Sequence, residues 1–140
     1  MIQQVRKITP RHVDTLRDNE IVVFGSNLSG HHGAGLAATA MVKWGARYGV
    51  AEGLTGHCYA LPTKPRDLRL ALPLEEISKH VKQFIGFAKN HPELQFLVTE
   101  VGCGFAWYKP EQIAPLFTRA INVSNISLPA SFLAVLNERG

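Results

Sequence analysis

Two glycine-rich turns in this chain have the residue types that phosphate binding requires. The first lies in FGSNLSGHHGAGLAA, residues 24–38, directly after the apolar run 21–23. The second is the Gly-Cys-Gly turn at 102–104, which follows the apolar run 96–98. Glycine lets a backbone come close to a ligand, and a helix that begins at such a turn points unpaired N–H groups at it. Two such turns therefore predict a diphosphate held from both sides.

Strands and helices that alternate along the chain must position these turns. Apolar runs predict strands over 21–25, 57–61 (ended by Pro62) and 95–101. Helical spacing of apolar residues predicts helices over 36–44, 73–90 and about 111–122, the last starting at Pro110 or Pro115.

The two ends of the chain are less regular. Thr9 followed by Pro10 is typical of a helix N-terminus, so we expect a short helix from there to about Asp18. The segment 127–136 fits either a last strand or a helix.

Alternating strands and helices predict a three-layer α/β/α sandwich with a mostly parallel central sheet, as a single domain over residues 1–140. In such sheets ligands bind outside the carboxyl ends of the strands. Three loops leave those ends, at 25–35, 62–69 and 102–109. The sequence therefore predicts a binding site among these loops.

The chain carries a formal net charge of +4, from 15 Lys and Arg against 11 Asp and Glu. This balance favours an anionic ligand. The basic residues are scattered instead of forming the stripe that is typical of nucleic-acid binding. Nucleic acid is therefore not the expected partner, although a non-enzymatic RNA-binding module remains the alternative function.

Composition and cysteine usage restrict the setting. No apolar stretch approaches the run of about 20 residues that spans a bilayer, and the N-terminus lacks a secretory signal. We therefore expect a cytoplasmic protein without a membrane partner, in which Cys58 and Cys103 are reduced thiols. No local pairing of metal-binding residues fits a zinc site, and no motif requires another cofactor.

Two well-known phosphate motifs fit the first turn poorly. Gly25 and Gly30 have P-loop spacing, but His31 and His32 stand where Lys and Ser or Thr are required. Residues 33–38 match a relaxed dinucleotide fingerprint but follow the strand too late. A Rossmann dehydrogenase is therefore only a minor alternative.

At these residues the chain resembles the macro domain family, which binds ADP-ribose. The resemblance rests on FGSN at 24–27, HGAGLA at 32–37 and GCGFAWY at 102–108, and it covers roughly residues 20–120. It is closest to small bacterial and phage macro-like proteins. It implies that the ligand is ADP-ribose or a related NAD-derived nucleotide, free or attached to an ADP-ribosylated protein.

The resemblance assigns roles to the first turn. Asn27 would hydrogen-bond the distal ribose, and the alternative is that it only caps the turn. Gly33 and Gly35 would let the backbone reach the distal ribose and the diphosphate. The remaining ligand-binding candidates in this turn are Gly25, Ser26 and Ala34.

The second turn receives matching roles. Its N–H groups would bind the diphosphate and belong to Gly102, Cys103, Gly104 and Phe105. Trp107 or Tyr108 would flank the distal ribose, or would instead be core aromatics.

Hydrolysis is a separate question, because Ala37 and Ala106 stand where the acid-dependent classes of the family carry Asp. The resemblance leaves Asn27, His32 and Lys64 as catalytic candidates for hydrolysing an ADP-ribosyl bond or ADP-ribose 1″-phosphate. Whether the protein is such a hydrolase or only a binder stays open. A nucleophilic Cys103 is a minor alternative.

The family's adenine-binding Asp has no counterpart at its usual place. Asp14, Asp18 and Glu20 are later candidates that the sequence does not rank.

Overall fold

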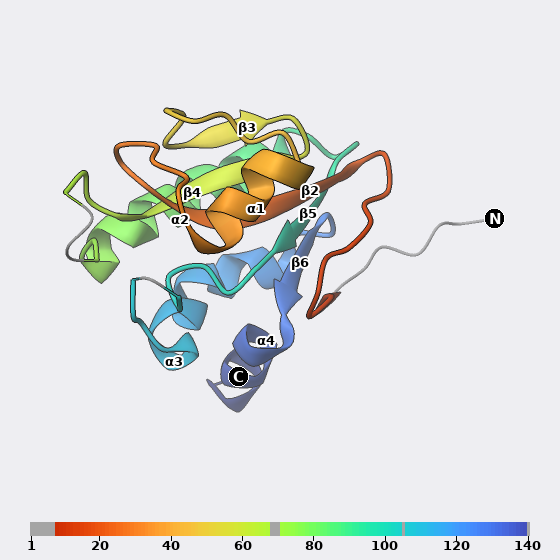
Figure 1. The fold of residues 1–140 in the computed structure, drawn as a ribbon. Coiled ribbons are helices and arrows are strands. Elements are labelled where there is room, and N and C mark those ends of the chain that lie inside the picture. The colour runs from red at the N-terminus through yellow and green to blue at the C-terminus, as the bar shows by residue number, and fades with distance from the viewer. Residues whose placement is uncertain (1–7, 68–70, 105, 140) are drawn as a thin grey trace.

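Six strands form one sheet in the computed structural model, which describes residues 8–67, 71–104 and 106–139 (Figure 1). The strands are β1 (Ile8–Thr9), β2 (Glu20–Asn27), β3 (Gly53–Thr55), β4 (Cys58–Lys64), β5 (Gln95–Val98) and β6 (Ile126–Pro129). Their order across the sheet is β1-β6-β5-β2-β4-β3, and every neighbouring pair is parallel except β3 with β4. The carboxyl ends of β1, β6, β5, β2 and β4 therefore meet at one edge of the sheet.

Helices connect these strands. They are α1 (Gly35–Lys43), α2 (Leu74–Lys89), α3 (Pro110–Ile113), the 3-10 helix η1 (Ala114–Asn122) and α4 (Ala130–Arg139). Within the described ranges, none of them has the length and apolarity that crossing a membrane requires.

Side chains along β2 alternate between the two faces of the sheet. Val22 and Phe24 pack with Ala40 of α1 in one buried cluster. Ile21 and Val23 belong to a larger cluster on the other face, which also takes side chains from α2, η1 and α4. Both faces of the strand are buried, as a continuous apolar run predicts for a parallel strand.

The expected mixed α/β class with a mostly parallel sheet is confirmed. Helices cover both faces of the sheet, so the arrangement is compatible with an α/β sandwich (Figure 1). The strands expected over 21–25, 57–61 and 95–101 exist as β2, β4 and β5, and the first two helices exist as α1 and α2.

The prediction of a short helix after Thr9 is wrong. Ile8 and Thr9 form a strand that pairs with Leu128 and Pro129, more than a hundred residues away. The segment 10–18 contains no helix. Its apolar residues pack against the buried cluster beside α1 instead, and these are Val13 and Leu16. Long-range pairing and burial thus override a local helix-start pattern.

Pro62 does not end the second strand, which continues to Lys64. β3 pairs only with residues 58–60, so beyond Ala60 that side of β4 has no strand partner. A residue without an N–H is tolerated where no ladder hydrogen bond is lost. The site-facing end of β4 is therefore longer than expected.

In the C-terminal third, the structure decides two points that the sequence left open. Residues 127–136 contain both a strand and a helix, because β6 ends at Pro129 and α4 begins at Ala130. Both prolines start a helix, since Pro110 opens α3 and Pro115 lies in the first turn of η1. Strand β5 ends at Val98, three residues earlier than expected.

Candidate functional site

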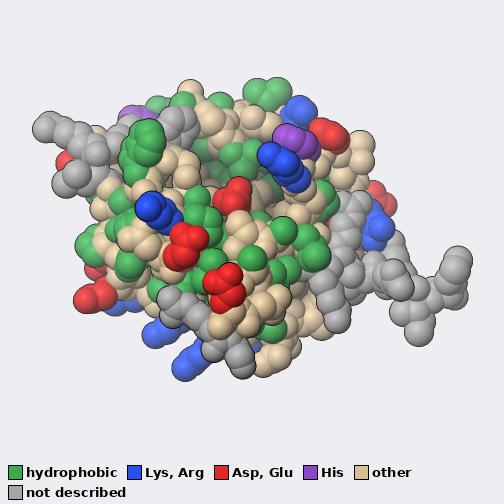
Figure 2. Space-filling view, turned by 90° about the horizontal axis from the view of Figure 1, so that it is seen from below, with side chains coloured by type: hydrophobic (Ala, Val, Ile, Leu, Met, Phe, Trp, Pro, Cys, Tyr) green, Lys and Arg blue, Asp and Glu red, His purple; other side chains and the backbone are tan. Residues whose placement is uncertain are grey.

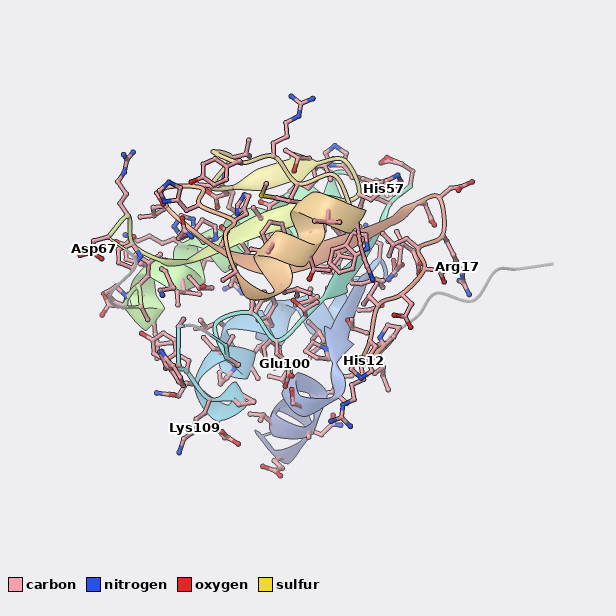
Figure 3. The ribbon with its side chains drawn as sticks, in the orientation of Figure 1. His12, Arg17, His57, Asp67, Glu100 and Lys109 are labelled. Atoms are coloured by element: carbon pink, nitrogen blue, oxygen red, sulfur yellow. The ribbon has the colours of Figure 1, made fainter. Side chains whose placement is uncertain are left out.

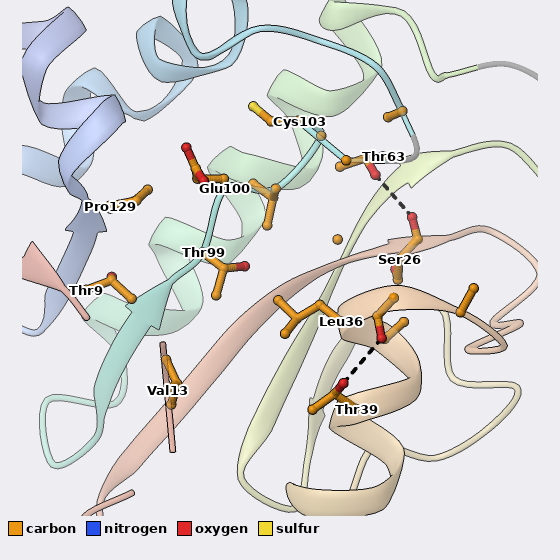
Figure 4. Close-up of a pocket in the computed structure, with 18 of the residues that line it drawn as sticks. Thr9, Val13, Ser26, Leu36, Thr39, Thr63, Thr99, Glu100, Cys103 and Pro129 are labelled. Atoms are coloured by element: carbon orange, nitrogen blue, oxygen red, sulfur yellow. Dashed lines mark hydrogen bonds between the residues drawn. The ribbon is translucent and has the colours of Figure 1, made fainter. Parts of the chain in front are cut away.

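A cleft of about 1380 Å³ opens at the shared carboxyl edge of the parallel strands (Figure 4). Residues from β1, β6, β2 and β4, from the loops that follow β1, β2 and β5, and from the start of α1 line it. Figure 4 shows Glu100 and Pro129 on one side of the cleft and Ser26 and Leu36 on the other. The cleft thus lies where the sheet topology brings the expected loops together.

Most of the residues expected at the site line this cleft. They are Gly25, Ser26, Asn27, Gly33, Ala34, Gly35, Lys64, Gly102, Cys103 and Gly104. A β-bulge between Ser26 and Asn27 sets Lys64 opposite Asn27 at the ends of β2 and β4. Both glycine turns and the end of β4 therefore face the same space.

Helix α1 begins inside the cleft without a side-chain cap. Its N-cap is Ala34, which supplies no hydrogen-bonding side chain. Gly35, Leu36 and Ala37 form the first turn and line the cleft. The first N–H groups of a helix have no partner inside it, and they carry the positive end of its dipole. This first turn can therefore receive an anion.

The side chain of Asn27 holds the first turn together. Its Oδ1 accepts hydrogen bonds from the Ser29 hydroxyl at 2.7 Å and from the His31 N–H at 2.9 Å. Its Nδ2 donates to the His31 carbonyl at 2.8 Å. Both acceptor positions of the amide oxygen are thus used within the loop, and one N–H remains for a ligand.

A second contact closes this loop against residues 47–50. Gly30 has a φ of +72°, and its carbonyl accepts the Gly49 N–H at 2.9 Å. A Cβ on Gly30 would lie 2.4 Å from the Gly49 carbonyl carbon. The rings of His31 and Tyr48, which both line the cleft, lie 5.0 Å apart. Glycine is therefore required at position 30, where the backbone lies against that of Gly49.

His32 does not line the cleft. Its side chain is 2% exposed, with Nε2 3.0 Å from the Val50 carbonyl oxygen. The imidazole also contacts the Phe24 ring edge-on, at a centroid distance of 5.3 Å. Its observed surroundings are those of a core histidine, away from the residues that line the cleft.

The two aromatic candidates also lie outside the cleft lining. Trp107 is 84% exposed and has a φ of +65°, which is unusual for a residue with a side chain. Tyr108 packs against the larger core cluster, and its hydroxyl donates to the Leu72 carbonyl at 2.7 Å. Phe105 lies outside the described residues.

Cys103 lines the cleft as a free thiol. Burial, together with the negative charges of Glu100 and Glu111, raises its pKa to about 11. The next helix begins only at Pro110, so no helix dipole acts on the thiol from a turn at 103. The thiol is protonated at neutral pH, which argues against a nucleophilic role.

Several residues of the cleft were not expected from the sequence. Glu100 lies two residues before the first glycine of the second turn, and its Oε2 accepts a hydrogen bond from the Ser131 hydroxyl at 2.5 Å. Arg11 and His12 reach the cleft from the segment after β1. No clear sequence pattern predicted strand β1 or its pairing with β6. The local sequence therefore did not indicate that Glu100, Arg11 and His12 would lie in the cleft.

The structure separates the three acids considered for adenine. Asp14 lines the cleft, whereas Asp18 borders a separate, smaller hollow. Glu20 is buried, and its Oε1 accepts the Arg17 N–H at 2.7 Å. Among these three, only Asp14 lines the cleft.

Among the described residues, no three His, Cys, Asp or Glu side chains lie close enough together to hold a metal ion. Comparisons with protein-family models, with curated proteins and with solved structures found no match to this chain.

Proposed function

We propose that this protein binds ADP-ribose or a related NAD-derived nucleotide in the cleft. The observation that carries the proposal is the uncapped first turn of α1, which lies in the same cleft as the turn at 102–104. Helix N-termini and glycine turns are the backbone features that bind phosphate. We assign the diphosphate to the space between these two turns.

Charges in the cleft support an anionic ligand. Arg11 and Lys64 contribute positive charge from opposite ends of the cleft lining, since one follows β1 and the other ends β4. The backbone N–H groups of α1 add partial positive charge between them. A phosphate group there would be attracted from more than one direction.

The strand order supports one orientation of the ligand. Lys64 and Asn27 lie at the β4 and β2 end, so the distal ribose belongs there, as in the macro domain pattern that the sequence resembles. The β1 and β6 end of the cleft carries the apolar residues Ile8 and Pro129, and Asp14, from the segment between β1 and β2, also lines the cleft. An apolar surface suits the face of adenine, and a carboxylate in the same cleft can accept a hydrogen bond from its amino group.

The cleft has room for a two-ended ligand. Its volume of about 1380 Å³ exceeds the range of about 300–1,000 Å³ that is usual for small-molecule pockets. A nucleotide that extends from β1 to β4 would use this length, whereas a simple phosphate would leave most of it empty.

We propose binding without hydrolysis. Ala37 and Ala106 replace the acids of the acid-dependent classes, and His32 is buried outside the cleft. At the proposed distal ribose, Lys64 supplies charge without an acidic partner from either of these two positions. Wild-type protein should therefore leave mono-ADP-ribosylated protein and ADP-ribose 1″-phosphate intact, and release of ADP-ribose from either substrate would refute this part of the proposal.

Titration calorimetry against ADP-ribose, AMP and NAD tests the binding proposal. We expect ADP-ribose to bind, and Lys64→Ala to weaken that binding by about tenfold through loss of a charged contact. Lys82→Ala is the matched control, because Lys82 is exposed on α2, outside the cleft lining. Absence of heat with all three nucleotides would refute the proposal.

RNA binding is the rival outcome. On the face shown in Figure 2, Lys and Arg side chains are interspersed with acidic and hydrophobic ones instead of forming a stripe. An RNA-binding module predicts affinity for single-stranded RNA that falls steeply with salt. We expect no such affinity at physiological ionic strength.

A further inference from the structure

Glu100 brings a carboxylate into a cleft that is otherwise suited to an anion. It follows β5 and lies two residues before the first glycine of the turn at 102–104. In Figure 3 it lies close to the start of α4, away from the outer positions of Asp67 and Lys109. A negative charge beside a phosphate site weakens phosphate binding unless it has a partner of its own on the ligand.

Ser131 holds this carboxylate in place. The Ser131 hydroxyl, in the first turn of α4, donates to Glu100 Oε2 at 2.5 Å. A carboxylate has about four acceptor positions, and Ser131 occupies one of them. Glu100 can therefore accept further hydrogen bonds from a ligand in the cleft without leaving this position.

The strand order locates Glu100 relative to the proposed ligand. Strand β5 lies between β6 and β2 in the sheet. Glu100 therefore lies between the first turn of α1, which borders the proposed diphosphate site, and the apolar β1–β6 end, to which we assign adenine. In ADP-ribose the part of the molecule between diphosphate and adenine is the adenosine ribose, which offers two vicinal hydroxyls.

We infer that Glu100, positioned by Ser131, accepts hydrogen bonds from the 2′- and 3′-hydroxyls of the adenosine ribose. This inference rests on the proposed function and adds a specificity to it. An acidic residue that accepts a ribose 2′-hydroxyl is a known way to select an unmodified ribose over one that carries a 2′-phosphate. The cleft is therefore specific for NAD-derived ligands and rejects NADP-derived ones.

Calorimetric titration with ADP-ribose and with 2′-phospho-ADP-ribose tests this specificity. We expect wild type to bind ADP-ribose at least about tenfold more tightly, because a 2′-phosphate both loses the hydroxyl donor and repels the carboxylate. Glu100→Gln keeps the shape of the side chain and removes its charge. We expect this variant to bind ADP-ribose more weakly, 2′-phospho-ADP-ribose more tightly, and to lose most of the preference.

Glu111→Gln is the matched control. Glu111 also acts electrostatically on Cys103, but it lies on α3 outside the cleft lining. The preference should survive in this variant. A role of Glu100 limited to stabilising the start of α4 would change thermal stability without changing the ratio of the two affinities.

The possible failures can be told apart. If wild type binds neither ligand, the proposed function fails and the ribose assignment falls with it. If wild type binds both ligands equally, or if Glu100→Gln retains the wild-type preference, the ribose assignment is overturned while nucleotide binding stands.

Discussion

At the scale of single residues, Asn27 shows how a candidate ligand contact can also be a structural one. Three hydrogen bonds tie its amide to Ser29 and His31 within the loop. The sequence motif is the same whether the Asn side chain binds a ribose or the backbone of its own loop. Loss of function in an Asn27 variant would therefore report on the shape of the loop as well as on a ligand contact.

The thiol of Cys103 gives a prediction at the same scale. Burial is the main reason that its pKa lies near 11, so little thiolate exists at pH 8. We expect iodoacetamide to alkylate Cys103 roughly tenfold more slowly at pH 8 than it alkylates an unstructured cysteine peptide. The rate should rise as the pH passes 9 toward 11, which mass spectrometry of the modified protein can follow.

Cys58 provides an internal comparison, because it is fully buried and should stay unmodified while the protein is folded. Saturation with ADP-ribose should slow the reaction at Cys103 further, since this residue lines the cleft. If Cys103 were alkylated at pH 8 as fast as the cysteine of the free peptide, the raised pKa would be contradicted. A nucleophilic role for Cys103 would then be supported.

At the scale of elements, the first glycine turn contains two different kinds of glycine. Gly30 has a positive φ and lies against the Gly49 backbone, whereas a Cβ on Gly33 would meet no atom within 4 Å. We expect Gly30→Ala to lower the free energy of unfolding by at least about 2 kcal/mol, and Gly33→Ala to change it by less than about 0.5 kcal/mol. Urea denaturation measures both values.

The same pair separates folding from binding. Gly33 lines the cleft, so its added methyl group should weaken ADP-ribose binding even though stability is unchanged. Equal stability of the two alanine variants would show that the Gly30–Gly49 contact does not control the loop.

At the scale of the whole molecule, the buried Tyr59 makes the free energy of unfolding depend on pH in the alkaline range. Burial, with a smaller contribution from the charge of Glu52, raises its pKa to about 12, against an ordinary value of 10.0. A phenol that ionises later in the folded state contributes stability that is fully present below pH 10. That contribution is lost as the pH rises through 12, because the unfolded chain ionises first.

We therefore expect the free energy of unfolding to fall between pH 9 and pH 11.5, with about 2 kcal/mol of the decline due to Tyr59. In Tyr59→Phe the decline should be smaller by that amount, as measured by urea denaturation at the two pH values. Tyr48→Phe removes an exposed phenol. In this control variant the free energy of unfolding should decline by as much as it does in wild type. An unchanged decline in Tyr59→Phe would refute this assignment.

Local pattern in the sequence was sufficient for much of the fold and for the position of the cleft. The apolar run at 21–23 predicts a strand buried on both faces, because a residue that faces either helix layer must be apolar. Alternation with helices makes the sheet parallel, and a parallel sheet brings all the strand ends to one edge. Both glycine turns were therefore expected at the same edge before any contact was known.

Tertiary structure alone decided which side chains face the cleft. Thr9 belongs to a strand because it pairs with Pro129, and no local pattern contains that pairing. His32 and Asn27 are both polar and close in sequence, yet the core encloses the imidazole while the amide holds the loop. Glu100 meets Ser131 only because β5 and β6 are neighbours. Such contacts depend on the packing of distant segments, and local propensity carries no information about it.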